Sequence, residues 1–421
     1  MRRLPDVPRG RAITVDLEGT SVPAHEGEPV ACSLLAAGES VLSRSVKYHR
    51  PRSAYCFAAA CSHCLMRVDG VPNVYTCQTP ARPGMRLERQ NAYPSAKVDA
   101  FEAIDWLFPR GLNHHEMFAG VPVAEQVMSK VARQLAGLGL LPDREAPARA
   151  AAKILRTHVA IVGGGPAGRA ALETVLARGA DAHLFEREPA RAGSPAYPPT
   201  HHPRASVVGL YDDEHGRFLA VAALESGAPQ LWKVYAERFV LAVGGHPSML
   251  PFENNDLPGV IAGQALVKLL EPPIGIAPRR AALVGWGEAL ETTRAALVAR
   301  GVEMAAVVAV REEDPYGVHG TALKAHGLAR VSALSYLAAG KRVKVACDAV
   351  AVCLPPSPSF ELARQGGARI HFDPQRESFA VEADADGRTH APDVFVACGL
   401  TAEAASAAGR RAALAALGAR S

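Results

Sequence analysis

The sequence lacks any apolar run near the length of about 20 residues that a membrane-spanning helix requires. It also lacks the apolar stretch that would have to follow Arg2 and Arg3 in a signal peptide, so neither a secretory nor a twin-arginine signal is expected. An excess of one charge is missing too, because 46 basic residues face 42 acidic ones and leave a formal charge of only +4. These absences predict a cytoplasmic protein with no transmembrane segment and no nucleic-acid partner.

Cysteine is sparse, since eight residues are too few for a disulfide scaffold in a chain of 421 residues. What is present is ordinary globular composition, with 48% hydrophobic and 21% charged residues, and this excludes an intrinsically disordered chain. The length exceeds that of a usual single domain and predicts two or three domains.

Four of the eight cysteines fall in one window with the spacing C-x4-C-x2-C-x12-C, as Cys56, Cys61, Cys64 and Cys77. This is the plant-type arrangement for a [2Fe-2S] cluster, in which three thiolates lie on one loop and a fourth comes from a nearby strand. The small residues Ala58–Ala60 would let backbone N–H groups approach the sulfur atoms. We therefore predict that these four cysteines are the metal ligands of a [2Fe-2S] cluster.

Two other interpretations of these cysteines stay open. Four thiolates can also hold zinc, although zinc sites usually present two closely spaced pairs, and the four thiols could be unrelated to any metal. His63 is predicted to be a loop residue and not a ligand. The remaining cysteines lie in or beside apolar segments, where a free thiol behaves as a small hydrophobic group, and are predicted to be structural: Cys32, Cys347, Cys353 and Cys398.

The segment before the cysteine window predicts a small β-rich module. Two alternating strands flank Glu18 and Gly19, and a short helix is expected from about Pro29 to Ala37. A hairpin followed by a helix is the opening of a ferredoxin-like β-grasp fold. We predict a [2Fe-2S] ferredoxin-like domain at residues 1–95 and a helical connector at residues 96–155.

A dinucleotide-binding fingerprint follows the connector. A buried strand at His158–Val162 runs into Gly-Gly-Gly-Pro-Ala-Gly and a helix through about Arg178, and a second strand at Ala182–Phe185 ends on an acid. In this pattern the glycines permit a tight turn beside a pyrophosphate, and the acid accepts from a ribose hydroxyl. A unit that has lost its ligand is the alternative. The predicted cofactor-binding residues, two of which follow later strands, are Gly163, Gly165, Pro166, Ala167, Gly168, Glu186, Gly244 and Gly399.

A weaker copy of the fingerprint lies further along the chain. A strand at Ala281–Val284, a turn at Gly285–Glu288 and a helix at Ala289–Ala299 repeat the order of the first copy. Here Leu290 replaces the third glycine and Trp286 lies in the turn, and both would crowd a pyrophosphate. We predict a structural nested domain in preference to an NAD(P) site.

These elements predict an α/β and α+β multidomain protein, with an N-terminal β-grasp ferredoxin-like domain followed by two nested Rossmann-like domains. The FAD- or NAD-binding domain is assigned to residues 156–246 together with 346–421. The second Rossmann-like domain is assigned to residues 247–345, between those two segments.

Four motifs point to a known family: Lys-Tyr-His-Arg-Pro-Arg at residues 47–52, the first glycine turn at 163–168, Phe-Glu-Asn-Asn-Asp-Leu-Pro-Gly-Val at 252–260, and Val-Phe-Val-Ala-Cys-Gly at 394–399. The chain resembles the α subunit of heterotetrameric sarcosine oxidase. It is equally similar to the α and small iron–sulfur subunits of proline, hydroxyproline and opine dehydrogenases and of hydrogen cyanide synthase. The resemblance implies an oxidoreductase subunit that carries a [2Fe-2S] cluster and FAD, or NAD in its place, and that works beside an amino-acid-oxidase-type FAD β subunit.

The chain departs from that family pattern in ways that bear on function. The sarcosine oxidase α subunit generally lacks the four cysteines, so their presence favours a dehydrogenase. The folate-binding half of that subunit is absent from this sequence, so one-carbon capture is not expected. The segment from Glu188 to Ser206 is short and rich in proline, and Leu400 stands where an Asp commonly binds the ribityl chain of FAD. Both changes weaken the case for FAD.

The sequence thus predicts an electron-transfer subunit of a flavin-dependent amine or imino-acid dehydrogenase. The alternatives are a stand-alone NAD(P)H-dependent iron–sulfur flavoprotein reductase and a non-redox scaffold subunit. No catalytic acid or base is assigned, since His114, His115, His201 and His202 lie in polar segments and are predicted to face solvent. The amine, the final electron acceptor and the subunit stoichiometry are not specified by the sequence.

Overall fold

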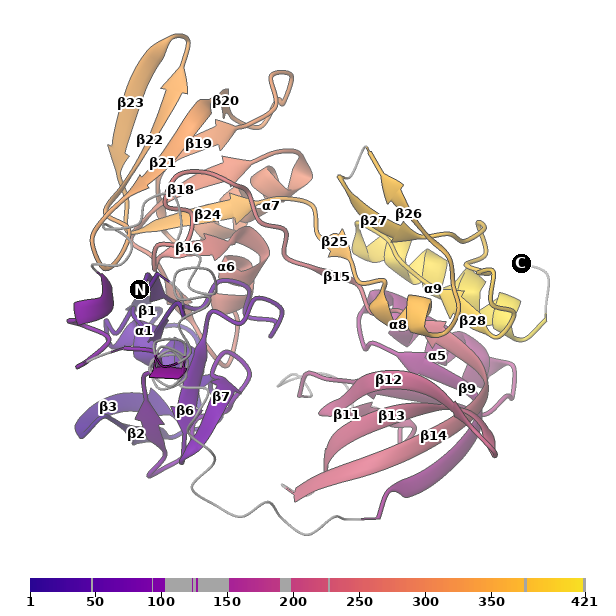
Figure 1. Ribbon diagram of the computed structural model, residues 1–421. Coiled ribbons are helices and arrows are strands. Elements are labelled where there is room, and N and C mark those ends of the chain that lie inside the picture. The colour runs from indigo at the N-terminus through magenta and orange to yellow at the C-terminus, as the bar shows by residue number, and fades with distance from the viewer. Residues whose placement is uncertain are drawn as a thin grey trace. The chain divides into compact units, whose positions relative to one another are not determined.

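The computed structural model describes residues 1–46, 48–92, 94–102, 123, 126–127, 151–189, 198–225, 228–374 and 377–418. The chain forms two compact units, shown in Figure 1. The first unit comprises Met1–Ala146 and Pro247–Pro355, and the second comprises Pro147–His246 and Pro356–Ser421. None of the helices in these described ranges is long and apolar enough to cross a membrane.

The first unit opens with a mixed five-stranded sheet in the order β3-β2-β8-β6-β7. The predicted hairpin is confirmed, because β2 and β3 pair antiparallel around Glu18 and Gly19, which both adopt positive φ. Helix α1 packs its apolar face into the core, and we call this part, residues 1–92, the N-terminal module. Its elements are β1 (Arg2–Arg3), β2 (Ala12–Leu17), β3 (Thr20–His25), α1 (Val30–Ala36), β4 (Ser43–Arg44), β5 (Pro51–Arg52), β6 (Leu65–Val68), β7 (Val71–Tyr75) and β8 (Arg86–Glu88), and η1 (Ala100–Glu102) follows it.

The rest of the first unit, Pro247–Pro355, is called the nested domain here. It contains a parallel sheet in the order β16-β24-β18-β19-β20, whose strands are almost purely apolar because both faces are covered. A three-stranded antiparallel sheet, β21-β22-β23, accompanies it. The elements are β16 (Val260–Ala262), α6 (Gly263–Leu269), β17 (Ile276–Ala277), β18 (Arg280–Gly285), α7 (Glu288–Ala299), β19 (Glu303–Ala309), β20 (Val318–His319), β21 (Thr321–His326), β22 (Ala333–Ala338), β23 (Lys341–Ala346) and β24 (Ala349–Cys353).

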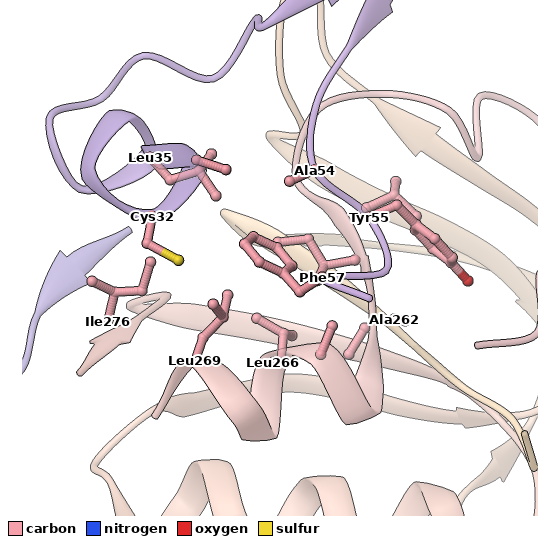
Figure 2. Close-up of a cluster of buried hydrophobic side chains, with 14 of the residues drawn as sticks. Cys32, Leu35, Ala54, Tyr55, Phe57, Ala262, Leu266, Leu269 and Ile276 are labelled. Carbon is pink, nitrogen blue, oxygen red and sulfur yellow. The ribbon is translucent and has the colours of Figure 1, made fainter. Parts of the chain in front are cut away.

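The N-terminal module and the nested domain share one hydrophobic core. Figure 2 shows Cys32 and Leu35 of α1, together with Phe57, facing Leu266 and Leu269 of α6. The first strand joins the two parts as well, since β1 pairs antiparallel with β17. The module that carries the cysteine window is therefore fixed on the nested domain by packing and by backbone hydrogen bonds.

The second unit is built on a seven-stranded sheet in the order β11-β10-β9-β14-β13-β12, with β28 paired to the end of β14. Alternate residues of β9 enter opposite cores, because Val159 and Ile161 face α5 and α9 whereas Ala160 and Val162 face β13 and α8. Its elements are β9 (Lys153–Val162), α5 (Pro166–Ala177), β10 (Ala182–Glu186), β11 (His201–Pro203), β12 (Ala205–Asp213), β13 (Gly216–Glu225), β14 (Ala228–Leu241), β15 (Gly245–His246), β25 (Ser357–Pro358), α8 (Glu361–Gln365), β26 (Ile370–Asp373), β27 (Ser378–Val381), β28 (Val394–Val396) and α9 (Ala402–Ala416).

The order of strand, glycine turn, helix and strand predicted for the first fingerprint is confirmed by β9, α5 and β10. Strand β9 begins at Lys153, inside the predicted connector. Most of that connector, with His114 and His115, lies outside the described residues. The antiparallel meander β12-β13-β14 is a feature that the sequence analysis did not predict.

Candidate redox-centre and dinucleotide sites

The four predicted cluster cysteines lie close together in the first unit. Cys56, Cys61 and Cys64 are on the loop between β5 and β6, and Cys77 follows β7. Cys56, Cys64 and Cys77 are 4%, 1% and 2% exposed, and Cys61 is half-buried. All eight cysteines of the chain are described, and each is a free thiol. The structure thus brings together the four residues that spacing alone selected.

Hydrogen bonds join the four sulfur atoms and set their protonation. The Cys61 and Cys77 thiols, followed by the N–H groups of Ala58 and Ala60, lower the pKa of Cys56 to about 2 against the opposing effect of burial. The two backbone N–H groups lie 3.4 and 3.3 Å from Cys56 Sγ. Donation to Cys56 raises the pKa of Cys61, and donation from Cys77 lowers that of Cys64. Hydrogen bonds from neighbouring thiols and from the loop backbone thus favour thiolate, the form that binds metal, within this group of four cysteines.

The loop backbone is held in a shape that it would not adopt alone. Phe57, Ala59 and Ser62 have φ of 47°, 54° and 57°, in the left-handed region, which costs roughly 1–2 kcal/mol for each non-glycine residue. Gln78 Nε2 donates to the Phe57 carbonyl at 2.8 Å, and Thr76 Oγ1 donates to the Cys64 carbonyl at 2.6 Å. These contacts hold the strained loop around its sulfur atoms.

The nested domain anchors the same loop from the other side. The N–H of Ala262, at the end of β16, donates to the Tyr55 carbonyl at 3.1 Å, and the Tyr55 hydroxyl donates to the Ser248 carbonyl at 2.6 Å. Phe57 is 2% exposed and packs beside Leu266, as Figure 2 shows. The position of the cysteines thus depends on residues about 200 positions further along the chain.

Two sequence motifs that lie far apart meet beside the loop. Asp256 of the segment 252–260 lies 3.8 Å from the guanidinium of Arg50 and 3.7 Å from that of Arg52. Arg52 also donates to His63 Nε2 at 3.4 Å. Burial, and then the neighbouring Arg52 charge, lower the pKa of His63 to about 4, so that its imidazole is neutral at pH 7.

The four cysteines supply the donor type and number that a [2Fe-2S] cluster requires, because such a cluster shares four thiolates between two irons. Two backbone N–H groups are directed at one of the four sulfur atoms. Among the described residues, no three His, Cys, Asp or Glu side chains are placed as ligands of one ion.

The first glycine turn joins β9 to α5 in the second unit. A Cβ on Gly168 would lie 1.8 Å from the Gly163 carbonyl oxygen, so the helix packs on the strand as closely as only glycine permits. At Gly165 no described atom lies within 4 Å of a Cβ position. Pro166 and Ala167 begin α5, and a helix N-terminus is the kind of position that binds an anion. The turn is thus tight where the helix packs and open where a pyrophosphate would bind.

Glu186 lies at the end of β10, beside this turn. Its carboxylate accepts from the N–H groups of Gly164 and Glu188, and these bonds fix its orientation. Arg169 Nη1 donates to the Gly164 carbonyl at 3.2 Å and places a positive charge on the same rim. The acid predicted to accept from a ribose hydroxyl therefore lies beside the turn, where both of its carboxylate oxygens accept from backbone N–H groups.

Gly244 and Gly399 follow β14 and β28, at the carboxyl end of the same sheet. A cavity of about 290 Å³ opens there, and its lining includes Gly244, Ser359, Asp384, Cys398 and Arg411. A Cβ on Gly399 would lie 2.3 Å from the Ala405 nitrogen, so Gly399 packs against the first turn of α9.

The expectation that Cys398 is a structural core thiol is wrong, because β28 ends at Val396 and the Cys398 side chain is exposed. Cys347 and Cys353 are buried, as expected, and burial raises their pKa to about 11 and about 12.

The expectation that His201 faces solvent is also wrong. His201 belongs to β11, which pairs with β10 in register with Leu184, and it is only 7% exposed. Burial lowers its pKa, opposed by the nearby Glu186 charge. His202 is half-buried, and its ring stacks on His183 and Phe185. The β-branched pair Val207–Val208 and the apolar residues Leu210 and Tyr211, a few positions after these histidines, were the signal for a strand region.

Comparisons with known proteins agree with this arrangement. Residues 10–92 match the domain family described as 2Fe-2S iron-sulfur cluster binding domain. Sarcosine oxidase subunit alpha from Rhizobium meliloti is 25% identical over 444 aligned residues, which cover 94% of this chain and 45% of that protein. The chain thus spans less than half the length of this relative.

Two further relatives are informative. Hydrogen cyanide synthase subunit HcnA from Pseudomonas aeruginosa is 39% identical over 85 residues, which are 20% of this chain and 81% of that protein. The crystal structure of L-proline dehydrogenase from P. horikoshii shares the fold, with a TM-score of 0.70 at 20% identity over 100% of this chain and 77% of that one. The chain is therefore similar in sequence to sarcosine oxidase alpha subunits along most of its length, and its residues 10–92 match a 2Fe-2S iron–sulfur cluster binding domain.

Proposed function

We propose that this chain is the electron-transfer subunit of a flavin-dependent dehydrogenase that oxidises a secondary amine or imino acid, of the sarcosine, proline, hydroxyproline or opine type. The observation that carries the proposal is the buried set of Cys56, Cys61, Cys64 and Cys77, with backbone N–H groups directed at Cys56 Sγ. These four residues would hold the [2Fe-2S] cluster.

When bound, the cluster supplies one-electron transfer beside the two-electron chemistry of a flavin. The chain contributes the surroundings that make such a centre usable. Ala58 and Ala60 N–H groups stabilise negative charge on sulfur, and the half-buried Cys61 leaves one edge of the loop near solvent, where electrons can enter or leave. Burial of the other three cysteines excludes water from the opposite side.

A dinucleotide, FAD or NAD, would bind at the first glycine turn of the second unit. The proposal places its pyrophosphate at Gly165 and the start of α5, and its adenosine ribose against Glu186. Acid release of the bound nucleotide followed by chromatography distinguishes FAD, NAD and an empty site.

The cluster is tested by anaerobic purification of the full chain. Cys64 and Cys32 are buried thiols of the same core, but only Cys64 lies in the cysteine loop. We expect about two irons per chain in the wild type, the same content in Cys32→Ala, and loss of iron and of the reduced-state paramagnetic signal in Cys64→Ala. Iron-free wild-type protein made with sufficient iron would contradict the proposal.

The partner is tested by combining the chain with an amino-acid-oxidase-type flavoprotein. We propose an amino-acid-oxidase-type FAD subunit that removes two electrons from the amine. With that subunit present, sarcosine or proline should bleach the visible absorption of the cluster under anaerobic conditions, and neither should do so without it. Bleaching by NADPH alone at a comparable rate would support the stand-alone reductase instead. A complex that forms normally with iron-free Cys64→Ala and retains full turnover would support the scaffold alternative.

A further inference from the structure

The second glycine turn, between β18 and α7 of the nested domain, has the chain path of a dinucleotide site. Strand, turn and helix follow the order of the first turn, with Gly285, Trp286 and Gly287 in the places of Gly163, Gly164 and Gly165. Each turn also lies against the end of a neighbouring strand. A Cβ on Gly285 would lie 1.8 Å from the Cys353 carbonyl oxygen at the end of β24, and a Cβ on Gly163 would lie 2.3 Å from the Ala242 carbonyl oxygen just after β14. The order of strand, turn and helix is thus that of a dinucleotide site, but Gly287 has a φ of 69° where Gly165 has −69°.

Both turns hold a carboxylate, but at different N–H groups: Glu186 accepts from Gly164 in the first turn, whereas in the second turn the acceptor lies at the position that corresponds to Gly165. The Gly287 N–H, which precedes the first residue of α7, donates to Asp314 Oδ2 at 2.5 Å. Asp314 Oδ1 accepts from the N–H of Tyr316 at 2.9 Å, which fixes the carboxylate in place. A helix N-terminus binds phosphate through such N–H groups, so the anion position is already occupied by the chain itself.

Two further features act in the same direction. The backbone N–H of Trp286 donates to the Cys353 carbonyl at 3.1 Å, and the Arg311 guanidinium lies 4.3 Å from the centre of the Trp286 ring. This stacked pair occupies the rim where a nucleotide would enter. The first turn of α7 also carries Glu288 and Glu291, and acids at a helix N-terminus repel a phosphate as strongly as they stabilise the helix.

We propose that the nested domain is a closed dinucleotide fold, in which the Asp314 carboxylate occupies the place of a nucleotide phosphate and excludes NADH and NADPH. The domain instead serves to hold the cysteine loop through Ala262 and Leu266. Both coenzymes need testing, because an arginine after the second strand, the place of Arg311, is the residue type that accepts the 2′-phosphate of NADPH. This inference does not depend on the proposed function, since nucleotide binding is measured without iron or a partner.

The experiment uses the full chain with Gly165→Val, whose side chain fills the space for a ligand at the first turn. The substitution should not disturb the fold, because no described atom lies within 4 Å of the Cβ position at Gly165. Equilibrium dialysis with NADH and with NADPH should show no saturable binding up to about 1 mM. Adding Trp286→Ala and Asp314→Ala should tighten binding at least about tenfold, because a charge-assisted competitor is removed. Adding Glu313→Ala, which removes an exposed charge of the same sign next to Asp314, should change nothing.

Hydrogen exchange of the Gly287 amide gives a second readout that needs no ligand. Exchange should be slow in the wild type and in Glu313→Ala, and fast in Asp314→Ala, where the acceptor is gone. Saturable binding of either coenzyme by the Gly165→Val chain would overturn the proposal. An unchanged affinity after Trp286→Ala and Asp314→Ala, or equally fast Gly287 exchange in the wild type, would overturn it as well.

Discussion

The two glycine turns of this chain share the order of strand, turn and helix, but they differ in backbone conformation and in what fills them. In the second unit, α5 begins with Pro166, Ala167, Gly168 and Arg169, and the Gly165 position faces open space among the described atoms. In the nested domain, Asp314 accepts from the equivalent N–H, and the helix begins with acids. The same supersecondary unit can thus be a ligand site or a structural support, and a few side chains decide which.

The contrast extends to helix packing. Gly168 lets α5 approach β9 to the limit, whereas α7 carries the fully buried Leu290 at the corresponding position. The third glycine of the fingerprint serves close packing of helix on strand, so the leucine departs from the pattern of a pyrophosphate site. In return, the carboxyl ends of the nested strands contact the cysteine loop, as at Ala262 and Tyr55. The nested fold therefore supports the metal site of its own unit.

The largest expected effect is on the free energy of unfolding, and it distinguishes Gly168, which permits close helix packing, from Gly165, which leaves space for a ligand. Gly168→Ala places a methyl group 1.8 Å from a backbone oxygen, and we expect it to lower the free energy of unfolding of the second unit by about 4 kcal/mol. Gly165→Ala adds the same methyl group to open space and should change stability by less than about 0.5 kcal/mol. Urea titration followed by circular dichroism measures both. Equal effects would mean that the two glycines do not differ in this way.

The supporting role of the nested domain is tested at its contact with the cysteine loop. Leu266 is fully buried beside Phe57, so Leu266→Ala should cost about 3 kcal/mol and accelerate iron release to a chelator. Val298→Ala on α7 is the control, because that side chain is 48% exposed. An iron-release rate that responds equally to both variants would show that the loop does not depend on this packing.

The ligand-binding role of the first turn is tested by adding an apolar side chain at Gly165. Gly165→Val should weaken dinucleotide binding at least about 100-fold, near 2.7 kcal/mol, and should leave the melting temperature of the nucleotide-free protein unchanged. The wild type and Gly165→Ala provide the reference affinities in the same dialysis experiment. If Gly165→Val retains a full complement of dinucleotide, the ligand lies elsewhere and the first turn is as closed as the second.

The smallest expected effect concerns pH. Burial lowers the pKa of His183 and His201 in the folded second unit, so the unfolded chain binds more protons just below pH 6.5. Stability should therefore be complete above that pH and fall as the pH drops through the window between the unfolded and folded values. The urea midpoint at pH 7.5 and 5.5 measures this, and His183→Gln should reduce the difference. His215→Gln, at an exposed turn, should not, and a midpoint that rises on acidification would contradict the account.

Local patterns predicted the local parts of this fold. The hairpin at Glu18 and Gly19, the order of β9, α5 and β10, and the grouping of Cys56 with Cys61 and Cys64 follow from residues close together in sequence. Parts that depend on distant segments were not predictable in this way. The core shared by Phe57 and Leu266 is such a case, since nothing near either residue specifies the other.

The sequence analysis missed the hydrogen bond from the Gly287 N–H to Asp314 and the burial of His201 for related reasons. Asp314 lies 27 residues after Gly287, and only the fold brings its carboxylate to that N–H. His201 follows a proline-rich segment that suggests a loop, but pairing of β11 with β10 places the side chain inside. In both cases tertiary contacts overrode a polar local context.

The central claim is that one unit holds a metal centre and a closed nucleotide fold while the other holds the open nucleotide site. The most direct test is to quantify iron and dinucleotide in one sample of anaerobically purified full-length protein. The account predicts about two irons and no more than one dinucleotide per chain, with the nucleotide lost in Gly165→Val and the iron retained. A chain without iron, or one that keeps a bound dinucleotide after Gly165→Val, would contradict it.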